Sequence, residues 1–120
     1  MPSGSTIDAG GTANTKGSYT QMVASTSRDY CALAWCMDSL NVTPANTANF
    51  LVDVAIGGAG SEQVIVSNLF AQRLLEPVFP EFWIIPVEIP AATRVAMRCQ
   101  SNSNVAGTQT FGATLYGVYK

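Results

Sequence analysis

The sequence contains no histidine among its 120 residues and has few charged side chains. Without imidazole, mechanisms with a histidine base and metal sites with histidine ligands are excluded. Charged residues make up 12% of the chain, with six Lys and Arg against eight Asp and Glu, whereas soluble proteins average about 25%. The basic residues form no block, so we expect no nucleic acid as a partner.

The spacing of the cysteines does not suit a metal site. The three cysteines are Cys31, Cys36 and Cys99, with no C-x-x-C pair. Because Cys31 and Cys36 are five residues apart, a strand would place them on opposite faces, where they cannot bridge. We expect buried, reduced thiols, no metal and no cofactor, which suits assembly in a reducing cytosol.

Long apolar runs are missing as well. The first eight residues lack the apolar region of a signal peptide. The longest uncharged run, residues 99–119, is rich in Gln, Ser, Asn and Thr. We therefore expect neither a signal peptide nor a membrane span.

What the sequence does contain is a series of apolar or alternating segments separated by turn residues. We expect strands at 18–25, 30–37, 49–56, 63–70, 81–89, 94–100 and 108–119, although residues 68–75 could instead form one helical turn. A spacing of about ten residues without an amphipathic helix is typical of an antiparallel sandwich. A short strand around Ile7 would bring the number to eight, as in a jelly roll. The predicted fold class is all-β: an antiparallel two-sheet β-sandwich of the jelly-roll type over residues 18–120.

Glycine and proline give local expectations within this pattern. The turn at Gly57–Gly60 needs residues that tolerate a positive φ. The segment 81–89 is flanked by Pro80 and Pro90 and interrupted by Pro86. A proline has no N–H to donate, so this strand should lie at a sheet edge or be bulged.

Residues 1–17 are expected to form an extended N-terminal arm. Ile7 is the one large apolar residue after Met1 among Gly, Ser, Thr and Ala, too little to offset the entropy of ordering. We expect Ser3–Ala9 to add as a strand to a neighbouring subunit, with Ser3 and Ile7 as partner contacts. The alternative is that this segment crosses the open edge of its own domain.

Asp53 interrupts a strongly apolar strand and is the foremost polar candidate. A buried carboxylate is tolerated when it is paired, and Arg94 or Arg98 could pair with it as a structural ion pair. Asp53 and Glu62 could alternatively be the two carboxylates of a glycosidase, but the chain has only two Trp to build a sugar-binding cleft. We therefore expect no catalytic residue.

The aromatic residues Phe79, Phe82 and Trp83 lie within the proline-bounded region. They are candidate partner contacts, because aromatic side chains on an edge strand can form a protein-binding surface or a platform for sugars. The alternative is ordinary core packing. Low charge adds to the first interpretation, since a freely diffusing monomer normally keeps charge on its surface.

Three segments carry a resemblance to a known group of proteins: FLVDVAIGGAGSEQVIVSNLF at 50–70, PVEIPAATRVAMRCQ at 86–100 and the terminal TLYGVYK. They resemble small bacteriophage virion structural proteins of the capsid decoration or cement type and related tail and fibre modules. The likeness spans about residues 18–120, and Ala92 stands where the pattern more often has glycine. The positions that match are Asp53, Ser61, Glu62, Pro90, Thr93, Arg94 and Gln100.

The resemblance implies a non-enzymatic virion protein that is assembled in the cytoplasm of the host bacterium. Its expected partners are the major capsid protein or another virion protein, and further copies of itself, as a trimer. The expected function is to decorate and cement the capsid, where symmetry multiplies modest contacts. The alternative is a carbohydrate- or receptor-binding module of a phage tail fibre.

Overall fold

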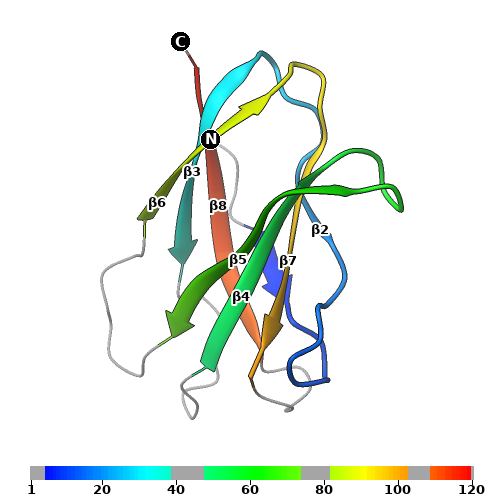
Figure 1. The fold of residues 1–120 in the computed structure, drawn as a ribbon, viewed down its shortest axis with the longest axis vertical. Helices are drawn as coiled ribbons and strands as arrows, with labels where there is room; N and C mark the ends of the chain where they lie inside the picture. The colour runs from blue at the N-terminus through cyan, green and yellow to red at the C-terminus, as the bar shows by residue number, and fades with distance from the viewer. Residues whose placement is uncertain (1–4, 39–47, 74–81, 103–108, 120) are drawn as a thin grey trace.

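The computed structural model describes residues 5–38, 48–73, 82–102 and 109–119 (Figure 1). In these ranges the chain forms eight strands and no helix. The strands are β1 (Ser5–Asp8), β2 (Thr20–Val23), β3 (Tyr30–Asp38), β4 (Ala48–Ile56), β5 (Gln63–Arg73), β6 (Phe82–Ile89), β7 (Val95–Ser101) and β8 (Thr110–Val118). The predicted all-β class is confirmed. Because β5 continues to Arg73, the alternative expectation of a helical turn from residue 68 was wrong.

The strands form two antiparallel sheets that pack as a sandwich. Sheet A has the order β1-β8-β3-β6, and sheet B has the order β2-β7-β4-β5. In Figure 1, β6, β3 and β8 run side by side on the left of the view. The pairing is nested along the chain: β1 pairs with β8, β2 with β7, β3 with β6 and β4 with β5.

The core lies between the sheets and is built from alternate residues of the strands. Three rings form its centre, with ring centroids 6.2 Å apart for Trp35 and Phe111 and 5.1 Å apart for Phe50 and Phe111. Tilted and edge-to-face contacts at these distances favour aromatic packing. Since one face of each strand points to the core, the other face is available to solvent or to a partner.

Strand β6 lies at an edge of sheet A, as its prolines predicted. Pro86 is opposite Ala32, and the register of β3 and β6 shifts between Tyr30 and Ala32. Both parts of the expectation are met, because an edge position and an irregular ladder are the two ways in which a strand accommodates a missing N–H.

The N-terminal segment, where the structure describes it, belongs to the chain's own sandwich. Ser5–Asp8 pair with Thr110–Ala113 of β8, and Ile7 and Ala9 are buried in the core. Further along, the Gly17 N–H donates to the Cys99 carbonyl at 2.8 Å. The expectation that Ile7 contacts a neighbouring subunit was therefore wrong, and the alternative, an edge strand of the same domain, is what the structure has.

Ala92 occupies a turn that would suit glycine. Its φ is 59°, in the left-handed region that L-residues with a Cβ avoid. The turn is held in place by Thr26, whose hydroxyl donates to the Pro90 carbonyl at 2.7 Å and accepts from the Thr93 N–H at 2.9 Å. In the turn after β4, glycines take this role as predicted, since Gly57 and Gly60 have φ of 111° and 84°.

Replacing Ala92 with glycine should stabilise the protein by about 0.5–1 kcal/mol. The substitution removes the strain of a left-handed alanine, and this gain exceeds the loss caused by the larger entropy of the unfolded chain. Urea denaturation measures the change as a higher midpoint. Ala91→Gly is the matched control, since no positive φ is found at Ala91, and it should lower the midpoint. A lower midpoint for Ala92→Gly would contradict the assignment of strain.

No helix of the described residues is long and apolar enough to cross a membrane.

Candidate functional site

The outer face of sheet B carries a charge cluster centred on Asp53. This carboxylate, on β4, is buried and accepts from Lys16 Nζ at 2.7 Å and from Arg98 Nε at 3.0 Å. The backbone N–H of Asn68 donates to the same carboxylate at 3.0 Å, where the register of β4 and β5 is irregular. The predicted pair of Asp53 with Arg98 is present.

Arg94 does not pair with Asp53 and belongs to a second cluster on the same face. Its guanidinium donates to Glu62 Oε1 and to the Gly57 carbonyl, both at 3.1 Å, and to Gln21 at 3.0 Å. Glu62 also accepts from the Gly60 N–H at 2.9 Å. Arg94 therefore ties the turn after β4 to β2, and the expected alternative of an Asp53–Arg94 pair was wrong.

The pKa values of both carboxyls are lower than usual, which argues against an acid–base role. Burial raises the pKa of Asp53, but hydrogen bonds from Lys16, Asn68 and Arg98 outweigh it, so the net shift is downward from 3.8. Hydrogen bonds from the backbone N–H of Glu62 itself, from Arg94 and from Gly60 lower the pKa of Glu62 from 4.5. A glycosidase needs one carboxyl with a raised pKa, and neither group has it.

These shifts predict how stability depends on pH. A carboxyl with a lowered pKa in the folded state stabilises the protein above its unfolded pKa, and this contribution is lost as the pH falls through the folded pKa. The contribution of Asp53 and Glu62 should therefore be complete at neutral pH and decline below about pH 4.5. Thermal melting between pH 7 and pH 2 should show this decline, and Asp53→Asn should make it shallower. An equal decline in that variant would contradict the role of Asp53.

The outer face of sheet A is different, because three rows of uncharged side chains cross β8, β3 and β6. We call this surface the apolar face. Its rows follow from the strand register and are Val118–Ala32–Pro86, Tyr116–Ala34–Ile84 and Thr114–Cys36–Phe82.

On the apolar face the β3 side chains in the middle of the rows are small, and larger side chains of β8 and β6 project beyond them on both sides. Ala32 and Ala34 are buried although they point away from the core, because larger residues stand on both sides. The side chains on the flanks are exposed: Phe82 by 58%, Ile84 by 65%, Tyr116 by 42% and Val118 by 41%. Contiguous apolar patches on protein surfaces are commonly sites of contact with a partner or ligand.

Of the predicted partner contacts, Phe82 and Trp83 lie at this edge. Phe82 belongs to the apolar face, while Trp83 is opposite Trp35 and points to the core side of β6, with 43% of its surface exposed. Both side chains are exposed, and their role as partner contacts stays a prediction. Ser3 and Phe79 lie outside the described residues.

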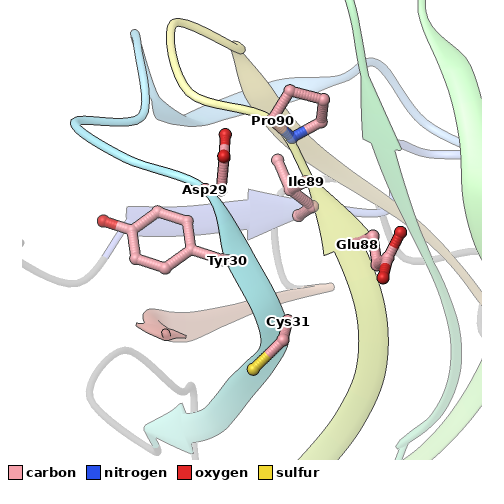
Figure 2. A pocket seen from close by; sticks show the side chains of 6 residues that line it. All are labelled: Asp29, Tyr30, Cys31, Glu88, Ile89 and Pro90. Carbon is pink, nitrogen blue, oxygen red and sulfur yellow. The ribbon is translucent and has the colours of Figure 1, made fainter. Parts of the chain in front are cut away.

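An open pocket of about 730 Å³ lies where β3 begins and β6 ends (Figure 2). Its polar groups include the carboxyls of Asp29 and Glu88 and the hydroxyl of Tyr30. Asp29 accepts from the Ala91 N–H at 2.7 Å, and the Tyr30 hydroxyl lies 3.3 Å from the hydroxyl of Ser27. The pocket has a volume typical of small-ligand sites, and its carboxylates could accept hydrogen bonds from sugar hydroxyls.

The three cysteines are not equally buried, contrary to the expectation. Cys99 is buried in the core, whereas Cys31 and Cys36 are partly exposed, and none forms a disulfide. Burial raises the pKa of the Cys99 thiol to about 12. No group of three or more His, Cys, Asp or Glu that could hold a metal ion occurs in the part of the chain that the structure describes.

Thiol labelling should reveal this difference. Because the thiolate is the reactive form, Cys99 should not react with an aromatic disulfide reagent at neutral pH in the native protein, while Cys31 should. In guanidinium chloride all three should react. Mass spectrometry of labelled peptides identifies the sites. Native labelling of Cys99 as fast as that of Cys31 would contradict its position in the core.

Two functional features escaped the sequence reasoning. Lys16 lies in a segment interpreted as a separate arm, and nothing local in the sequence connects it with Asp53, which is 37 residues away. The apolar face escaped because its rows come from three strands, two of them far apart in the chain. The alternation of Phe82, Ile84 and Pro86 was a signal for its β6 flank.

Comparison of the chain with models of protein families, with curated proteins and with solved structures found no match.

Proposed function

We propose that the protein is a non-enzymatic structural component of a bacteriophage virion that decorates and cements the capsid through symmetric subunit contacts. The observation that carries the proposal is the difference between the two outer faces. The outer face of sheet B bears two ion-pair clusters, whereas none of the nine residues of the apolar face is charged. A protein that functions within an assembly can keep such a surface, because a partner covers it.

The residues that carry the resemblance to phage virion proteins support a structural role. Asp53, Glu62 and Arg94 lie in the two ion-pair clusters, and Thr93 and Pro90 belong to the turn that Thr26 holds. All five take part in contacts that hold neighbouring strands or turns in position. The nested pairing of the first four strands with the last four also supports a jelly-roll domain, in which eight antiparallel strands form two Greek keys.

Co-sedimentation with capsids tests this function. Purified protein is mixed with capsids of the parent phage that lack it, pelleted and quantified, with capsids of an unrelated phage as the control. We expect saturable binding to the parent capsids, with a stoichiometry set by the lattice symmetry, and greater resistance of the decorated particles to heat. Absence of binding to parent capsids would overturn the proposal.

The second candidate function is a carbohydrate-binding module of a tail fibre, which the pocket of Figure 2 favours. Its test is a glycan array in parallel with the capsid assay, with Glu88→Gln as the variant that removes one carboxylate. Glycan binding that Glu88→Gln abolishes, together with no binding to capsids, would favour this function over the first.

A further inference from the structure

We infer that the apolar face binds the same face of a second copy of this chain around a two-fold axis. The β6 flank (Phe82, Ile84 and Pro86) of each copy packs against the alanine column (Ala32, Ala34 and Cys36 of β3) of the other. This inference rests on the proposed function in one respect, namely that the protein acts through symmetric contacts between its own copies. It adds which surface is used and which residues meet, and it replaces the trimer that the resemblance implies with a two-fold pair.

The lack of charge on the apolar face suits contact with a second copy. In a two-fold interface each surface patch meets its own copy, so a charged group near the axis would face a like charge. None of the nine residues of the apolar face is charged. A neutral face is therefore suited to a second copy, whereas the outer face of sheet B would bring Arg94 and Arg98 near their own copies.

The shape of the apolar face is complementary to itself under a two-fold rotation. The low column of Ala32, Ala34 and Cys36 is directly beside the high column of Pro86, Ile84 and Phe82. A two-fold axis that runs along the strands between β3 and β6 places each high column over the low column of the partner. In the central row Ile84 then meets Ala34 of the second copy, and large side chains meet small ones at the close packing that protein interfaces require.

Tyr116 and Val118 complete this fit from the other side. They stand on β8, which borders the alanine column opposite β6. The column is therefore a groove with two walls, and the β6 flank of the partner would fill it. Sheets that pack face to face lie about 10 Å apart, which leaves room for one layer of interdigitated side chains.

The apolar face is also large enough for a specific interface. From the exposed fractions of its large side chains, the apolar face offers on the order of 500 Å² per copy, or about 1,000 Å² for a pair, which is the size that a specific interface has to reach. The arrangement also covers the exposed apolar side chains of β6. The outer face of sheet B, with its ion-pair clusters, stays outside this contact.

Sedimentation equilibrium of the purified full chain tests the inference. We expect a mass of twice 12.7 kDa at micromolar concentrations. Ile84→Lys should weaken self-association by about 30-fold or more, as expected for a charge at the centre of an interface. Phe70→Lys is the matched control, because Phe70 is 53% exposed on β5, the edge strand of the other sheet, and it should leave the dimer intact. Circular dichroism checks that both variants fold.

A size exchange provides a sharper test that introduces no charge. Ala34→Leu fills the groove and should give a monomer, whereas Ala34→Leu combined with Ile84→Ala should restore the dimer, since one residue of each pair is then large and the other small. As a second readout, Cys36 should be labelled faster in Ile84→Lys than in the native dimer, while labelling of Cys31 should be unchanged.

Each other outcome overturns the inference. A wild-type monomer, a trimer or larger species, a dimer that survives Ile84→Lys, or a double variant that stays monomeric would each do so. The capsid assay separates this inference from the proposed function. A monomer that still binds capsids overturns the two-fold contact alone, and a dimer that ignores capsids overturns the virion function alone.

Discussion

Deletion of residues 1–16 should leave a chain that does not fold cooperatively at room temperature. The deletion removes β1, an edge strand of sheet A, together with the buried Ile7 and Ala9. It also removes Lys16, one of the two cations that pair with Asp53. Domains are stable by only about 5–15 kcal/mol. The free energy lost with this core surface and with an ion-pair partner should therefore exceed the net stability of the sandwich.

The single substitution Ile7→Ala tests the same point on a measurable scale. Ile7 is fully buried, and its register partner on β8 is Phe111, one of the three core rings. Truncation of a buried isoleucine leaves a cavity and should cost about 2–5 kcal/mol. Urea denaturation measures the loss, and Val64→Ala on the exposed side of β5 is the control, with an expected change within about 0.5 kcal/mol. A truncated chain that melts like the full-length protein would show that β1 is a detachable arm.

Removal of both cations around Asp53 should have the second large effect. Lys16→Met together with Arg98→Met keeps the apolar stems of the two side chains but leaves a buried carboxylate with the Asn68 N–H as its remaining donor among the described contacts. A buried charge that loses its partners costs about 3–5 kcal/mol. The free energy of unfolding at pH 7, measured with urea, should fall by this amount.

Removal of Asp53 should cost less than removal of its partners. In Asp53→Leu the side chains of Lys16 and Arg98, which are 18% and 30% exposed, can turn their charges toward water. Adding Asp53→Leu to the double variant should therefore recover part of the lost stability, because it removes the unpaired charge. If the triple variant were less stable than the double variant, the burial cost assigned to Asp53 would be refuted.

Sequence reasoning succeeded where a property is local to one strand. Alternation and turn residues predicted the strands, and the three prolines predicted an edge position for β6. The Asp53–Arg98 pair was also predictable. A carboxylate within an apolar strand needs a cation, and residues 94–98 contain only two arginines that could supply it. Composition could not choose between Arg94 and Arg98. That choice followed from the register, which places Arg98 opposite Asp53 and leaves Arg94 near the turn after β4.

The sequence by itself determined that this is an all-β sandwich of about eight strands with little charge, because strand periodicity and turn chemistry depend on neighbours in the chain. Only the tertiary structure decided the role of residues 5–17. A single isoleucine cannot order a polar segment alone, but it can when seven other strands already provide the core that buries it. The same holds for the apolar face, because its rows arise when β8, β3 and β6 become neighbours. Pairing between distant strands is set by the packing of the whole sandwich, and the identity of nearby residues does not reveal it.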